Sequence, residues 1–218
     1  MEHMSTEDPA YTAAVADLLG VLAYGELTAF IRMAVDSDLA PTLALKSSMA
    51  GLAHTEYVQY SQLIEHMGSR GIDAEAAMAP FVTPFAAYHE RTKPRDWIEG
   101  LVKAFVGDGI AKDFYREMSA FVDDETRAVM GLALDDEGQA DFVVGVVRDT
   151  LKTDRTAAGR LSLWGRRLLG EALSQAQAAS VLVRRHLLDG ERRHAELARR
   201  AARPLLQDAS PTVVARLE

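Results

Sequence analysis

Apolar residues recur every three or four positions along nearly the whole chain of 218 residues. This spacing is the period of an amphipathic α-helix. No segment alternates apolar and polar residues as a half-buried strand does, and no Asn-Gly pair joins two such segments. The pattern therefore predicts an all-α protein.

Helix-start and helix-stop residues divide this pattern into segments. Asp8 followed by Pro9 predicts the start of a first helix, which should run to about residue 35. Further helices are expected over 41–68, 94–121, 125–134 and 137–152, and the connection over 69–94 is expected to be short helix and packed coil. A last long helical stretch should begin at about 156, break at 189–190 and continue to about 203. Two helices, a long crossover and more helices are typical of a four-helix bundle with accessory helices. The alternative, a helical solenoid, would need a sequence repeat that is not found.

The chain is expected to form one bundle domain over residues 1–205, followed by a tail over 206–218. It has no cysteine, which excludes disulfides, thiolate zinc sites, iron–sulfur clusters and cysteine nucleophiles. The N-terminus is polar and acidic, and no uninterrupted apolar run approaches the length of a membrane span. These features predict a soluble, cytoplasmic protein with no membrane partner.

The net charge of −8 is unevenly distributed. Residues 1–147 carry 10 Lys and Arg against 24 Asp and Glu, whereas residues 148–203 carry 13 against 6. The basic region 148–203 is either a solvated face that balances the acidic part or a surface that meets the phosphates of an anionic partner.

Three acids lie in the middle of apolar helix faces: Glu26, Glu56 and Asp108. Burying an unpaired carboxylate is costly, so these acids need partners. One interpretation is structural, with each acid paired to an arginine or hydrogen-bonded to a tyrosine (Tyr24, Tyr60 or Tyr115). The other is a pair of metal ions, and oxygen and imidazole ligands without thiolate suit iron or manganese.

Di-iron bundles take a carboxylate from two helices and Glu-x-x-His from the other two, because this spacing places both ligands on one helix face. Glu191 and His194 form the only such pair in the chain. After Glu56, Gln59 stands where the histidine is expected. In the fourth helix Glu171 lies nearer the middle, whereas Glu191 and His194 have the better ligand chemistry, and both alternatives stay open.

Three stretches carry a family resemblance: 78–81 (MAPF), 97–109 (WIEGLVKAFVGDG) and 163–168 (LWGRRL). They resemble actinobacterial ferritin-like proteins related to the tRNA hydroxylase that acts on 2-methylthio-N6-isopentenyladenosine. The resemblance extends from about residue 12 to 188 and implies a ferritin-like bundle with a di-iron centre that activates O2. It places ligands at Glu26, Glu56 and Asp108, with Gln59 in place of the family's histidine.

The first functional hypothesis is therefore an O2-dependent di-iron hydroxylase of a small or nucleoside-like substrate, with no catalytic residue assigned beyond the metal ligands. An external electron donor would be needed, because the chain has no flavin or nicotinamide motif. The second hypothesis is a ferritin-like protein with a degenerate or empty metal site that serves as an interaction module. A homodimer is expected.

Overall fold

The computed structural model describes residues 9–132, 134 and 138–187. All regular secondary structure in these residues is helical. The elements are, in order, α1 (Pro9–Asp36), η1 (Ser37–Leu39), α2 (Leu43–Ser69), α3 (Ala74–Met78), η2 (Ala79–Phe81), α4 (Val82–Arg91), α5 (Trp97–Ser119), α6 (Asp124–Leu132), α7 (Gly138–Thr153) and α8 (Ala157–Leu187). The all-α prediction is confirmed. The predicted break at 189–190 and the domain boundary at 205 lie outside the described residues.

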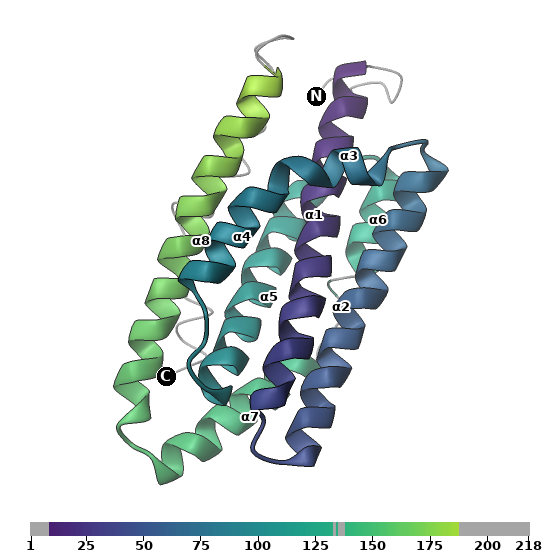
Figure 1. Cartoon of the computed structure of the whole chain (residues 1–218). Coiled ribbons are helices and arrows are strands. Elements are labelled where there is room, and N and C mark those ends of the chain that lie inside the picture. The colour runs from purple at the N-terminus through teal and green to yellow at the C-terminus, as the bar shows by residue number, and fades with distance from the viewer. Residues whose placement is uncertain (1–8, 133, 135–137, 188–218) are drawn as a thin grey trace.

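Four long helices run lengthwise through the molecule (Figure 1). The η1 turn joins α1 and α2 into an antiparallel pair, α5 packs against α1, and α8 packs against α4 and α5. The crossover from α2 to α5 consists of α3, η2 and α4, and α7 crosses the lower end of the bundle in Figure 1. This arrangement is the predicted bundle with one long crossover.

Capping residues explain where the helices begin. Thr42 is extended, and its side chain accepts a hydrogen bond from the Leu45 amide at 3.2 Å, so α2 begins at Leu43 rather than at Pro41 as predicted. The 69–94 connection contains less coil than expected. Pro80 and Pro84 lie in the first turns of η2 and α4, where a missing amide proton removes no helical hydrogen bond.

An ion cluster around the buried Glu99 fixes the start of α8 against the start of α5. The fully buried Glu99 accepts hydrogen bonds from Arg95 at 2.7 Å and from Arg160 of α8 at 2.8 Å. One turn further along α8, the Trp164 indole donates to the Glu99 carbonyl oxygen at 2.9 Å. These contacts couple the register of α8 to that of α5.

The core consists of two apolar clusters, one towards each end of the bundle. One cluster includes Met33, Met49, Ala53, Leu101, Val106 and Leu168. The other includes Leu19, Ala23, Leu63, Met67, Tyr115 and Met130. Along α1, α2 and α5 the boundary between them falls at the three inward acids, so a polar layer divides the core.

Segment Tyr11–Leu39 is long and apolar enough to cross a membrane by length and composition alone, although charged residues interrupt its apolar sequence. The sequence prediction of no membrane-length apolar run did not anticipate this segment. In the fold this segment is mainly α1, whose Leu19 and Ala23 are fully buried and whose Glu26 faces the polar layer. Of the apolar window in this segment, 39% is buried in the fold, so packing in the bundle accounts for part of the apolar composition of α1.

Candidate functional site

The three acids predicted from the helix faces meet in one layer. Glu26 and Glu56 are only 5% and 7% exposed, and their carboxyl groups are hydrogen-bonded to each other. Asp108 of α5 lies close enough for its charge to act on Glu26. The layer therefore takes one acid from each of α1, α2 and α5, and we refer to it as the carboxylate layer.

Tyr115 of α5 joins this layer. Its hydroxyl donates a hydrogen bond to Oε1 of Glu26, and its side chain is 2% exposed. Burial raises the pKa of Tyr115 well above its usual range, and the negative charge of Glu26 raises it further. Tyr115 thus stays a hydrogen-bond donor, as the structural interpretation of the acids allowed.

A lysine supplies positive charge to the same layer. The Lys112 ammonium lies 3.0 Å from the Asp108 carboxylate, and the two side chains are 11% and 17% exposed. The charge of Lys112 also lowers the pKa of Glu26. Sequence reasoning did not single out Lys112, although positions 108, 112 and 115 follow the spacing of one helix face.

The protonation of Glu26 reflects these neighbours. Burial raises the pKa of Glu26 and is the largest effect, and the Asp108 charge adds to it, while Glu56, Tyr115 and Lys112 act in the opposite direction. The net effect is a raised pKa, so Glu26 holds its proton to a higher pH than an exposed glutamate does.

The other predicted ligands have surroundings of their own or lie outside the described residues. Gln59 is half-buried, one turn after Glu56 on α2. Glu171 of α8 forms an ion pair with Arg91 of α4 at 3.4 Å, so it belongs to the contact between those helices. Glu191 and His194 lie outside the described residues.

These donors do not fit a di-iron centre, which takes carboxylates from four helices and two histidines. The layer has three carboxylates, no imidazole among the described residues and an ammonium ion in contact with one of the acids. Across residues 9–132, 134 and 138–187, no three His, Asp or Glu side chains are grouped so that they could hold a metal ion. An ammonium competes with a metal ion for the carboxylate lone pairs and repels it, so the described side chains of this layer do not suit a metal pair.

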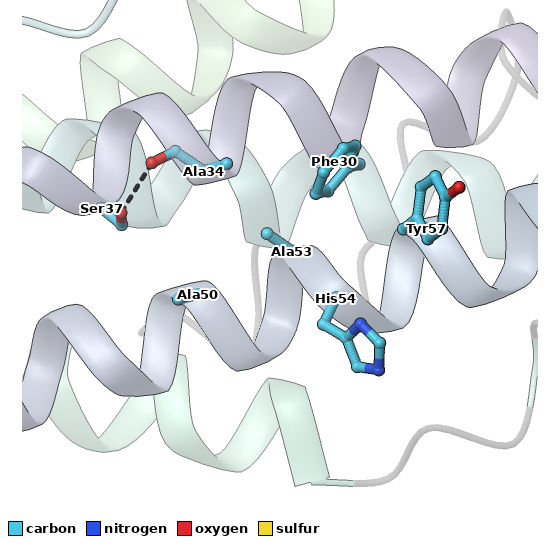
Figure 2. Close-up of a pocket in the computed structure, with 7 residues that line it drawn as sticks. All are labelled: Phe30, Ala34, Ser37, Ala50, Ala53, His54 and Tyr57. Atoms are coloured by element: carbon cyan, nitrogen blue, oxygen red, sulfur yellow. Dashed lines mark hydrogen bonds between the residues drawn. The ribbon is translucent and has the colours of Figure 1, made fainter.

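A groove of about 320 Å³ lies between α1 and α2, and its lining includes Phe30 and Ala53, one helical turn from Glu26 and Glu56. Its lining is mostly apolar and consists of Phe30, Ala34, Ser37, Ala50, Ala53, His54 and Tyr57. Figure 2 shows the Ser37 hydroxyl turned back to the Ala34 carbonyl oxygen, to which it donates a hydrogen bond of 2.6 Å. The remaining polar side chains of the lining are those of His54 and Tyr57.

Comparisons with known proteins agree with this architecture. A solved structure described as protein 19 with aldehyde deformylating oxidase activity, from Synechococcus, is similar over 98% of each chain, with a TM-score of 0.65 and 19% identity. At that identity the likeness supports the fold alone. A search of curated protein sequences finds no match. The family model for the ferritin-like domain of actinomycetes matches residues 9–190, and the chain belongs to that family.

Proposed function

We propose that this chain is a ferritin-like protein that works without a metal pair, as a homodimeric interaction module. The observation that carries the proposal is the ion pair of Lys112 with Asp108 inside the carboxylate layer. In this interpretation the lysine supplies the positive charge that buried acids require.

The layer contains positive charge and a hydrogen-bond donor without a metal ion. The Lys112 ammonium lies 3.0 Å from the Asp108 carboxylate. The Tyr115 hydroxyl donates a hydrogen bond to Glu26. Two divalent cations added to this set would leave an excess of buried positive charge, which is as costly as an excess of negative charge.

The outer surface of the α1–α2 pair is suited to bind another protein. Large apolar residues next to the groove are exposed, with Val35 60%, Ile31 45% and Val58 39% accessible, and Tyr57 at the groove itself is 44% accessible. Contiguous exposed apolar surface on a folded domain marks an interaction site. We refer to this surface, formed by Ile31, Val35, Tyr57, Val58 and the groove lining, as the α1–α2 face.

A second copy of the chain is the partner that the charge distribution favours. Between Ser47 and Ile64, Glu56 is the only residue that carries a formal charge at neutral pH, and it is buried, so the outside of α2 is uncharged over this length. Two copies with a net charge of −8 each repel one another over most of their surface. They can approach closely where that surface is neutral, and a two-fold contact uses the same patch on both copies.

Metal binding tests the first part of the proposal. Full-length protein incubated anaerobically with Fe(II) and then desalted should retain far less than one iron per chain and show no new absorbance on exposure to O2. The double variant Lys112→Ala with Gln59→His, which removes the competing ammonium and adds an imidazole, should retain more iron than the wild type. About two irons per wild-type chain, lost in Glu26→Ala and in Asp108→Ala, would contradict the proposal.

The second candidate is the O2-dependent di-iron hydroxylase that the sequence predicts, with a tRNA nucleoside as substrate. Its support is that Glu26, Glu56 and Asp108 come from three helices into one layer, which is how ferritin-like bundles arrange their metal ligands. The iron measurement above decides between the two candidates. For tRNA, charge reversal at Arg192 and Arg193 should weaken binding, and unchanged binding would leave region 148–203 as a solvated face.

A further inference from the structure

The outer side of α2 carries a row of accessible side chains at one edge of the bundle (Figure 1). Its members follow the three- and four-residue spacing that keeps side chains on one helix face: Lys46, Ala50, His54, Tyr57, Ser61 and Glu65. Ala50, His54 and Tyr57 also line the groove of the α1–α2 face (Figure 2). We refer to this row as the α2 stripe, which continues the α1–α2 face along most of the helix.

The α2 stripe has a charge at each end and none between. Lys46 is its first member and Glu65 its last. Between them in the sequence the only charged residue is Glu56, which is buried in the carboxylate layer. Glu65 is exposed and forms no ion pair with any other residue that the structure describes. The stripe is therefore a neutral surface with a cation at one end and an available anion at the other.

Opposite charges at the two ends distinguish between two ways of pairing identical stripes. If the two α2 helices run antiparallel, the cation of each copy meets the anion of the other, and a two-fold contact forms this pair twice. If they run parallel, Lys46 meets Lys46 and Glu65 meets Glu65. Like charges placed together oppose association, whereas complementary charges select a partner and fix its register. The end charges thus favour the antiparallel contact.

The sizes of the side chains between the ends agree with this direction. Tyr57 is 44% accessible and stands three residues after His54, whereas Gly51 stands three residues before it. A two-fold axis near His54 therefore places Tyr57 of each copy against Gly51 of the other. A β-carbon at Gly51 would meet nothing within 4 Å, so this position is open to a large side chain. The midpoint between Lys46 and Glu65 falls within two residues of His54, so one axis serves both kinds of contact.

We propose that the α1–α2 face recognises a second copy of the chain by an antiparallel contact of the two α2 stripes, with Lys46 of each copy paired to Glu65 of the other. This inference rests on the homodimer of the proposed function, and it adds the helix, its direction and the residues that select the partner. Lys46 already contacts Asp38 at 2.7 Å, but these two side chains are 39% and 84% exposed. An ammonium has three donors, so Lys46 can bind a second carboxylate at this open site.

Charge reversal tests the direction of the contact in the full-length protein. Lys46→Glu and Glu65→Lys should each weaken dimerisation about tenfold in analytical ultracentrifugation, because each brings like charges together at both ends of the contact. The double variant Lys46→Glu with Glu65→Lys should recover most of the loss, since its ends are again opposite in sign. Lys152→Glu is the matched control, because Lys152 also pairs with an exposed aspartate at 2.7 Å but lies on α7, and its dimerisation should equal that of the wild type.

Crosslinking tests the same direction independently, because the chain has no cysteine of its own. The variants Lys46→Cys and Glu65→Cys are treated with a short bis-maleimide, separately and as an equimolar mixture. The mixture should give a crosslink that joins position 46 of one copy to position 65 of the other, and each variant alone should give little product. His54→Cys, close to the axis, should crosslink to itself, and Leu163→Cys on α8 should not.

The outcomes separate this contact from the homodimer on which it rests. A dimeric wild type whose affinity is unchanged by both single charge reversals would overturn the antiparallel contact and leave the homodimer standing. So would a dimer in which Lys46→Cys and Glu65→Cys each crosslink mainly to themselves. A monomeric wild type would overturn the homodimer and the contact together. Thermal unfolding establishes that each variant is folded before its dimerisation is compared.

Discussion

Lys103 and Lys112 are both buried on α5, and their partners differ in kind. Lys112 contacts a carboxylate at 3.0 Å, whereas Lys103 contacts a backbone carbonyl oxygen and an aromatic ring. An opposite charge in contact stabilises an ammonium, and burial without such a contact destabilises it. One helix therefore carries a fixed cation at the carboxylate layer and, towards its start, an amine with a pKa of about 8.

The role of Lys112 predicts a large stability effect. Lys112→Met should lower the free energy of unfolding by about 2–4 kcal/mol, because it leaves the Asp108 carboxylate without its ammonium in a largely buried layer. Adding Asp108→Asn to this variant should recover part of the loss. Lys46→Met is the matched control, since Lys46 also pairs with an aspartate but at an exposed site, and its effect should be small. Urea denaturation measures both, and equal effects would show that Lys112 is not structurally central.

His89 predicts a specific dependence of stability on pH. Burial lowers its pKa from 6.5 to about 3, with further lowering by Lys103 and Arg32, so between these values the unfolded chain binds a proton that the folded chain does not. Stability should therefore fall as the pH decreases through this window, by at most about 1.4 kcal/mol per pH unit from this group. His89→Gln should lose less stability than the wild type between pH 7 and pH 4. Parallel stability curves in chemical denaturation would contradict a buried neutral imidazole.

At the scale of elements, the crossover is held to the bundle by close backbone contact. Gly20 of α1 lies so near the Ala77 carbonyl oxygen of α3 that a β-carbon at position 20 would overlap that atom. Such an approach is open only to glycine, and here it brings α3 directly onto α1. The crossover helices thus owe their position to one residue in α1 as well as to their own apolar faces.

Two matched substitutions test this contact. Gly20→Ala should destabilise the protein by about 1–3 kcal/mol, because α3 must move away from α1. Gly145→Ala, at an exposed position of α7 where a β-carbon would meet nothing within 4 Å, should instead stabilise it by about 0.5–1 kcal/mol. Thermal or urea unfolding measures both. Effects of the same sign would mean that helix propensity, not the α1–α3 contact, decides the outcome at position 20.

For the whole molecule, periodicity was enough to predict the bundle and the three acids of its polar layer, because an acid centred on an apolar face must point inward. Lys112 escaped prediction since a lysine four residues after an aspartate also fits an exposed helix pair. The ion pair of Glu171 with Arg91 could not be predicted from the sequence either. It depends on the rotation of α8 about its axis, which is set by packing against α4 and by the contact of Glu99 with Arg160. Sequence patterns define the faces of helices, whereas the charge balance of a site depends on how those faces meet.

The last prediction concerns assembly. Light scattering coupled to size-exclusion chromatography should give about twice the chain mass of 23.8 kDa. Val35→Asp and Tyr57→Asp should each convert the dimer to a monomer, because a two-fold contact brings both copies of the new charge into one apolar interface. Leu163→Asp is the matched control: Leu163 of α8 is 65% exposed, comparable to Val35 at 60%, but lies outside the α1–α2 face. A monomeric wild type, or a dimer broken only by Leu163→Asp, would show that this face does not join two copies.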